Sequence, residues 1–257
     1  MRKVFAGLRT LRGALVVSLA ILAVGASASA VFAATQDDTG INNGLLFSLS
    51  AGKGLKADFA KGDAAPSFND KVSAVQDPKS GPYIRSEGEQ VLAWRAPSNI
   101  YAQRGTLSFR WRARDPLGAQ PFPLFRVSYA DHTSWDMVWL RIDWNGNGLD
   151  AFVTDNNLAR VRVSARMDAI PAPGHWLNIA LCWDETQGIR LYVDGKLAAR
   201  KDAAAVLDSG LDQFGPFSRI ISPYQVQSSY QFVRGGDVAD IRIFDHALAP
   251  KSIAALA

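Results

Sequence analysis

The chain has 257 residues, of which 48% are hydrophobic and 20% are charged, and this composition excludes a disordered protein and allows a sizeable core. Its 21 glycines and 12 prolines follow no fixed short period, which excludes a collagen or a coiled coil. Lysine and arginine outnumber aspartate and glutamate by 28 to 24, but the excess equals the four basic residues within positions 1–34, a segment without acids. The rest of the chain is formally neutral, so its charge gives no reason to expect nucleic acid as a partner.

The first segment has the order of a secretory signal peptide. Residues 1–12 are cationic, residues 13–24 form an apolar run, and the small residues of positions 26–30 follow. An uncleaved membrane anchor is the alternative, but the run is shorter than the roughly 20 residues of a spanning helix. We predict a signal peptide over residues 1–34, one folded domain over residues 35–257, a secreted or periplasmic location, and contact with the membrane only during export.

The domain is predicted to be all-β. Residues 106–113 alternate apolar and polar side chains, and residues 137–144 repeat this pattern. In the second run one side carries Val138, Leu140, Ile142 and Trp144, and the other carries Trp139, Arg141 and Asp143. Alternation of this kind predicts strands with one buried face, whereas no stretch of about ten or more residues has the spacing of an amphipathic helix.

Turn residues separate the predicted strands at regular intervals. Residues 145–148, with the sequence Asn-Gly-Asn-Gly, precede a predicted strand at 149–154, and residues 155–157 precede another at 159–165. Further strands are predicted at 176–183, 189–193 and 238–244. This spacing favours antiparallel pairing in two packed sheets.

The only cysteine, Cys182, lies in the apolar run of residues 177–183. A single cysteine cannot form a disulfide within the chain, so the hydrophobic core must supply the stability. We expect its thiol to be buried and unreactive.

Residues 176–198, with the sequence WLNIALCWDETQGIRLYVDGKLA, resemble a hairpin of laminin-G-like domains in the concanavalin A-like lectin and glucanase superfamily. Residues 237–250 resemble the last strand and the short final helix of these domains, and residues 105–113 resemble an early core strand, so that the likeness covers about residues 44–257. The resemblance implies a jelly-roll sandwich of two antiparallel sheets that often binds carbohydrate, sometimes holds calcium, and in other branches hydrolyses glycans. Independently of the family, Asp194-Gly195 predicts a tight turn, because glycine accepts positive φ.

The carboxylates of a glycosidase are not evident in the sequence. Glycoside hydrolysis normally needs two carboxylates beside the bond, and the three glutamates, Glu87, Glu89 and Glu185, lie in predicted turns. The paired-glutamate strand motif of the superfamily's retaining glucanases is absent, although aspartate could take its place. A polysaccharide lyase could use His132, Tyr129 and Arg126, which match its chemistry in residue type only.

Arginine recurs on the polar side of the predicted strands, at Arg110, Arg112, Arg126, Arg141, Arg160, Arg162, Arg190 and Arg242. If neighbouring strands share register, these side chains gather on the outer face of a sheet, where guanidinium groups can bind carboxylate or sulfate. An anionic polysaccharide is then the ligand. The alternative is that these arginines pair with aspartates in solvent and protect the sheet against edge pairing.

A cluster of aromatic and polar residues is the second candidate site. Trp139 and Trp135 lie close in sequence to Tyr129, His132 and Asp136, and sugars stack on exposed aromatic rings while their hydroxyls bond to polar side chains. Trp139 lies on the polar side of its predicted strand, so we expect its ring to be exposed. The predicted ligand-binding set combines this cluster with Arg110, Arg112 and Arg141; ordinary sheet packing is the alternative for the cluster.

Asp237 and Asp240 flank the start of the last predicted strand. The resemblance implies a structural calcium ion there, and carboxylate oxygens suit it, but no contiguous calcium loop is present. Structural capping by Asp240 is the alternative, and no other cofactor is expected.

The sequence thus predicts an exported, non-catalytic carbohydrate-binding domain, with an anionic polysaccharide as the candidate glycan. The first alternative is a glycoside hydrolase or polysaccharide lyase, which would bring two carboxylates or a His-Tyr-Arg set together in a deep groove. The second is a protein-binding adhesion or envelope module, which would present a flat apolar patch.

Overall fold

The computed structural model describes residues 42–86, 92–129, 138–216 and 236–257, which belong to one compact unit, Asp37–Ala257. In these residues the chain forms antiparallel strands and one short helix, α1 (Pro250–Leu256). The predicted all-β fold and final helix are confirmed. The predicted signal peptide lies outside the described residues and stays a prediction.

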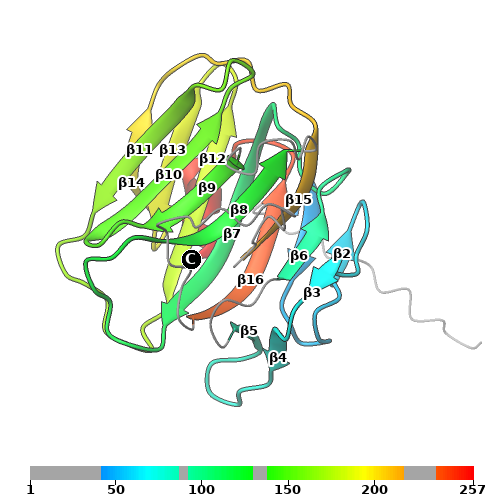
Figure 1. Cartoon of the computed structure of the whole chain (residues 1–257), viewed down its shortest axis with the longest axis vertical. Helices are drawn as coiled ribbons and strands as arrows, with labels where there is room; N and C mark the ends of the chain where they lie inside the picture. The colour runs from blue at the N-terminus through cyan, green and yellow to red at the C-terminus, as the bar shows by residue number, and fades with distance from the viewer. Residues whose placement is uncertain (1–41, 87–91, 130–137, 217–235) are drawn as a thin grey trace, which may run out of the picture. The chain divides into compact units, whose positions relative to one another are not determined.

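The described strands form two sheets, which lie one behind the other in Figure 1. The nine-stranded sheet has the path β14 (Lys196–Lys201), β13 (Gly188–Val193), β12 (Leu177–Asp184), β7 (Arg104–Ala113), β16 (Gly236–Phe244), β1 (Leu45–Leu49) and β2 (Phe59–Ala60), and β5 (Tyr83–Ser86) joins β16 and β4 (Ser73–Val75). The seven-stranded sheet has the order β11 (Arg160–Arg166), β10 (Gly148–Thr154), β9 (Val138–Trp144), β8 (Phe122–Tyr129), β15 (Leu211–Pro216), β6 (Leu92–Arg95) and β3 (Phe68–Asn69).

The main core lies between the two sheets. β7 contributes Leu107, Phe109 and Trp111, and the facing sheet contributes residues such as Ile142 and Trp144, all nearly or completely buried. β11 follows the predicted alternation over its whole length, with buried valines and alanine between exposed polar residues. Its period of two places one face on the core and the other away from it.

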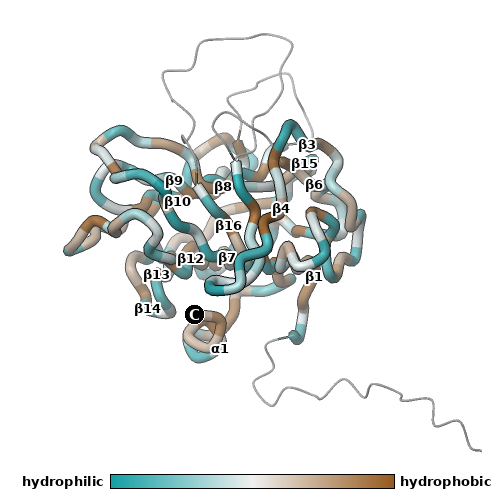
Figure 2. Tube along the Cα trace, turned by 90° about the horizontal axis from the view of Figure 1, so that it is seen from below, coloured by the Kyte–Doolittle hydropathy of each residue, from teal (hydrophilic) through white to brown (hydrophobic). Residues whose placement is uncertain are grey.

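A second, smaller cluster covers part of the outer face of the nine-stranded sheet. Ile253 of α1 packs with Cys182 and Tyr192, and Figure 2 shows α1 on the side of β12 and β13 that faces away from β9 and β10. The Cys182 thiol is buried, as expected. Burial raises its pKa to about 11, which disfavours the reactive thiolate form. At seven residues, the helix in the described part of the chain is too short to cross a membrane.

The predicted turns have the expected backbone. Asp194 and Gly195 both have positive φ, 48° and 72°, as a two-residue hairpin of type I′ requires. The Asp194 carboxylate accepts a hydrogen bond from the Asn178 backbone N–H at 2.9 Å. Asp194 is therefore a structural turn residue, as predicted.

Candidate functional site

The outer side of the seven-stranded sheet carries a row of basic side chains. Arg126 of β8 pairs in register with Arg141 of β9, and Phe152 of β10 pairs with both Arg141 and Arg162 of β11. Residues paired in register point to the same side of a sheet, so this row crosses four adjacent strands. Arg160, two residues before Arg162, shares that side. We refer to the set Arg126, Arg141, Asp143, Asp150, Phe152, Arg160 and Arg162 as the arginine face.

Phe152 is the centre of this face. The guanidinium carbons of Arg160, Arg141 and Arg162 lie 4.5, 5.2 and 5.3 Å from the centroid of its ring. Although the ring points away from the core, it is fully buried. Cations are attracted to an aromatic face, and the arginine stems cover apolar surface, so the ring holds three guanidinium groups close together.

Two aspartates lie among these arginines. Asp143 and Asp150 face each other across β9 and β10. Asp143 Oδ2 accepts a hydrogen bond from Arg141 Nε at 2.7 Å, whereas its buried Oδ1 has no partner. Burial raises the pKa of Asp143 above its usual value, and Arg141 opposes this effect. Within the arginine face, four guanidinium groups lie near two carboxylates, and those of Arg160 and Arg162 form no ion pair with another described residue.

The expectation that Trp139 is exposed is wrong. Its side chain is fully buried in the main core, and its ring packs edge-on against Trp183 with the centroids 5.5 Å apart. The cause is a β-bulge: Val127 pairs with Leu140 and Ser128 with Val138, so the register shifts at Trp139. A bulge adds one residue to one strand and re-aims its side chain. Trp139 therefore joins Leu140 in the core.

The other members of the predicted aromatic cluster do not form a site in the described residues. Tyr129 is half-buried against the main core, and its hydroxyl donates a long hydrogen bond of 3.4 Å to the Thr154 carbonyl. Burial raises the pKa of Tyr129. Trp135, His132 and Asp136 lie outside the described residues, so their predicted roles stay predictions.

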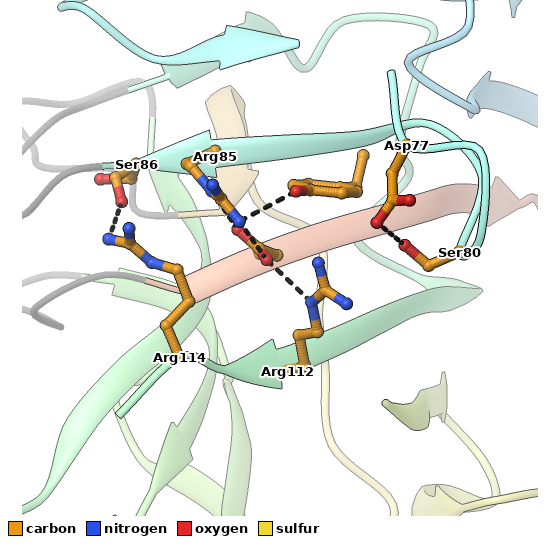
Figure 3. A network of polar contacts seen from close by, with 8 residues as sticks. Asp77, Ser80, Arg85, Ser86, Arg112 and Arg114 are labelled. Atoms are coloured by element: carbon orange, nitrogen blue, oxygen red, sulfur yellow. Dashed lines mark hydrogen bonds and ion pairs between the residues drawn. The ribbon is translucent and has the colours of Figure 1, made fainter. Parts of the chain in front are cut away.

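Arg110 and Arg112 lie on the other sheet, in a network around Asp237. This aspartate is fully buried, and its two oxygens accept hydrogen bonds from Arg85 Nε at 2.9 Å and Arg112 Nε at 2.8 Å. Figure 3 shows Arg85 and Arg112 converging on β16 from the two strands that flank it. The expectation that the arginines gather on one face therefore holds only in part: Arg126, Arg141, Arg160 and Arg162 share one face, whereas Arg110 and Arg112 lie on the other sheet.

Aromatic rings complete this second network. The guanidinium carbon of Arg112 lies 4.7 Å from the Tyr83 ring centroid and 4.5 Å from that of Trp176. Arg110 lies 5.0 Å from the Trp176 centroid, and its Nε is 2.7 Å from Asp240 Oδ2. The network ties β5 and the residue before β12 to β7 and β16, which is a structural task.

Asp237 and Asp240 do not fit a calcium site well. Each carboxylate contacts a guanidinium group, and a calcium ion needs six to eight oxygen ligands. No group of three or more potential acidic, histidine or cysteine ligands occurs among the described residues. Calcium binding by Asp237 and Asp240 stays a prediction. The available oxygen ligands disfavour it, because both carboxylates already contact arginines.

Sequence reasoning missed Phe152 as the centre of the arginine face. The signal was present, because Phe152 lies between Asp150 and Thr154 on the polar side of residues 149–154. An aromatic residue at an outward position is unusual unless other side chains cover it. It also missed Arg85 and Tyr83, whose strand had no predicted pattern.

The comparisons with known proteins agree with this architecture. The laminin-G sequence profile described as "Concanavalin A-like lectin/glucanases superfamily" matches residues 87–254, more than half of the chain. The chain belongs to this superfamily. A comparison with curated protein sequences finds no significant match.

Several solved structures share the fold of this superfamily member. The receptor binding domain of the botulinum neurotoxin C/D mosaic serotype has a TM-score of 0.61 at 13% identity, over 84% of this chain and 51% of the other. The binding domain of Paraclostridial Mosquitocidal Protein 1 has a TM-score of 0.59 at 14% identity, over 84% and 52%. The ligand binding domain of botulinum neurotoxin serotype D, solved with N-acetylneuraminic acid, has a TM-score of 0.60 at 14% identity, over 84% and 51%. The chain spans about half the length of these chains, and the likeness shows the fold.

Proposed function

We propose that this domain binds an anionic polysaccharide through the arginine face, without cleaving it. The observation that carries the proposal is the row of guanidinium groups in register across β8 to β11, where four arginines meet two carboxylates. Two of these arginines, Arg160 and Arg162, are exposed and lie over the Phe152 ring, and exposed cations held side by side favour an anionic partner.

The exposed end of the row offers the first contact to a ligand. Arg160 and Arg162 are exposed, and neither forms an ion pair with another described residue. A guanidinium fork matches the two oxygens of a carboxylate or sulfate. Since Phe152 already orders both side chains, less conformational entropy is lost when they bind.

The structural neighbours support a sugar as the source of the anion. The ligand binding domain of botulinum neurotoxin serotype D was solved with N-acetylneuraminic acid, a sugar that carries a carboxylate. The superfamily name itself joins lectins with glucanases. Polyuronates such as polygalacturonate and alginate present the same carboxylate chemistry at every sugar unit.

The test measures binding of residues 35–257 to polygalacturonate, alginate and neutral glucans on an array and by titration calorimetry. The double variant with Arg160→Gln and Arg162→Gln should bind the anionic polysaccharides about tenfold or more weakly than the wild type, because charge-assisted hydrogen bonds are lost. The matched control, Arg200→Gln with Lys201→Gln, removes the same charge from β14 and should change the affinity less than twofold. Equal losses in both double variants would show that binding follows net charge and not this face.

The export of this domain is a separate part of the proposal. Residues 1–12 are cationic and residues 13–24 are apolar, as in signal peptides. N-terminal sequencing of the protein recovered from the cell envelope and the medium should find a start near Thr35. A start at Met1 in the cytoplasmic fraction alone would contradict export.

A glycoside hydrolase is the second candidate function. Asp143 and Asp150 face each other on adjacent strands, and burial raises the pKa of Asp143, as a general acid would require. Assays for reducing ends and for unsaturated products on every glycan that binds should show no turnover. Turnover that Asp143→Asn abolishes would replace our proposal by hydrolysis, and binding to a protein but to no glycan would favour an adhesion module.

A further inference from the structure

An open depression lies at one end of the nine-stranded sheet, away from the arginine face. Arg104 begins β7 and pairs in register with Asp184, the last residue of β12, while Asp245 follows the end of β16. These ends meet because β7 is antiparallel to both neighbours. The depression has a volume of about 510 Å³, and its lining includes Tyr101, Gln103, Arg104, Asp184, Glu185 and Asp245. We refer to it as the Tyr101 depression.

Tyr101 supplies an exposed aromatic ring beside the depression. Its side chain is 40% exposed, whereas its backbone carbonyl accepts a hydrogen bond from the indole N–H of buried Trp183 at 3.1 Å. Gly105 allows Trp183 to lie there, because a Cβ at this glycine would come within 2.4 Å of the indole ring. An exposed aromatic ring on an anchored backbone, beside a depression, is a surface on which the C–H face of a sugar can stack.

Hydrogen-bond acceptors line the same depression as Tyr101, and a local contact holds one oxygen of each. Asp184 Oδ1 accepts bonds from the Thr186 backbone and hydroxyl at 2.8 and 2.6 Å. Glu185 Oε1 accepts a bond from the Leu207 backbone at 2.9 Å, and Asp245 Oδ1 contacts His246 Nδ1 at 2.7 Å. In each carboxylate the second oxygen accepts no hydrogen bond from another described residue, so it is available to a hydroxyl group.

The net negative charge of the depression favours an uncharged ligand. Three carboxylates, those of Asp184, Glu185 and Asp245, outnumber the one guanidinium group of Arg104. Burial acts to raise the pKa of Asp184, but its hydrogen bonds from Thr186 outweigh this and hold the pKa below the usual value. A ligand that carries carboxylate or sulfate would be repelled here, whereas hydroxyl groups would find ionised acceptors.

We propose that the Tyr101 depression is a second sugar subsite, which binds an uncharged hexose unit by stacking on Tyr101 and by hydrogen bonds from sugar hydroxyls to Asp184, Glu185 and Asp245. It differs from the arginine face in position and in charge. A chain that alternates neutral and acidic sugars could contact both sites, but the subsite does not depend on the arginine face.

Titration calorimetry with uncharged hexasaccharides of glucose and mannose, and with hexagalacturonate as the charged probe, tests this subsite. At least one uncharged hexasaccharide should bind, and Tyr101→Ala should weaken that binding about tenfold, the loss expected for one aromatic contact. Tyr101→Phe keeps the ring and should bind within twofold of the wild type. Phe59→Ala is the matched control, because Phe59 is 43% exposed but lies outside the depression, and it should have no effect.

The same titrations separate this proposal from the proposed function. The variant with Arg160→Gln and Arg162→Gln should lose hexagalacturonate binding and keep that of the uncharged sugar. Failure of every uncharged hexasaccharide to bind the wild type would overturn the subsite, and so would equal losses in Tyr101→Ala and Phe59→Ala. Neither result would affect the arginine face.

Discussion

The outer faces of the two sheets use the same residue types to different ends. On the nine-stranded sheet, Asp237 is fully buried and both its oxygens contact arginines. On the seven-stranded sheet, Asp143 has one oxygen without a partner, and the exposed side chains of Arg160 and Arg162 lie over Phe152 without an ion pair to another described residue. A cluster of arginine, aspartate and aromatic side chains is therefore a structural network when its central carboxylate is buried and both its oxygens are paired. It becomes a candidate binding surface when guanidinium groups are exposed and form no ion pair with neighbouring residues.

The largest expected effect concerns Trp139, whose ring lies in the main core. Trp139→Ala should lower the free energy of unfolding by about 3–5 kcal/mol, because it removes a fully buried indole that packs against Trp183. Urea denaturation measures this loss, and Phe59→Ala, at an exposed ring, should cost less than about 1 kcal/mol. A Trp139→Ala variant of unchanged stability that no longer binds glycan would show that the ring is a ligand platform.

Asp237→Ala tests whether the nine-stranded face is structural. The substitution leaves Arg85 and Arg112 without their shared carboxylate, and breaking a buried pair in this way costs about 3 kcal/mol or more. The control is Asp202→Ala, whose ion pairs with Arg190 and Arg200 span 3.9 and 3.6 Å and whose side chain is 60% exposed; it should cost less than about 1 kcal/mol. Equal losses in the two variants would contradict a structural network around Asp237.

The two faces also show which features the sequence could predict and which it could not. Alternation predicted the strands, and Asp194-Gly195 predicted its turn, because both follow from local backbone geometry. The side of the sheet on which Trp139 lies depends on a bulge opposite Val127 and Ser128, and register with a partner strand is not a local property. The separation of Arg112 from Arg141 depends in the same way on which strands share a sheet.

Arg110→Gln tests whether a predicted ligand-binding residue on the nine-stranded sheet contributes to stability or to glycan binding. The change removes the contact with half-exposed Asp240 and the stacking on Trp176, so it should lower the free energy of unfolding by about 1 kcal/mol. Anionic glycan binding should stay within twofold of the wild type, because Arg110 belongs to the other sheet. Urea denaturation and calorimetry measure the two quantities; loss of binding at unchanged stability would extend the binding surface to the nine-stranded sheet.

The smallest expected effect is the pH dependence of Asp143. Burial raises the pKa of this carboxyl group above its usual value of 3.8, so the folded state holds its proton more tightly than the unfolded state does. The stability that this proton contributes is present below the usual pKa and is lost as the pH rises from about 4 through the raised value. Asparagine has no such proton.

Asp143→Asn should therefore gain stability relative to the wild type as the pH rises from about 4 to 7, by an amount within about 1 kcal/mol. Urea denaturation of both proteins at several pH values gives the difference directly. The opposite trend, with the wild type gaining on the variant, would mean that the ion pair with Arg141 outweighs the cost of burying the carboxylate. The contrast between the two faces would then rest on the exposure of Arg160 and Arg162 alone.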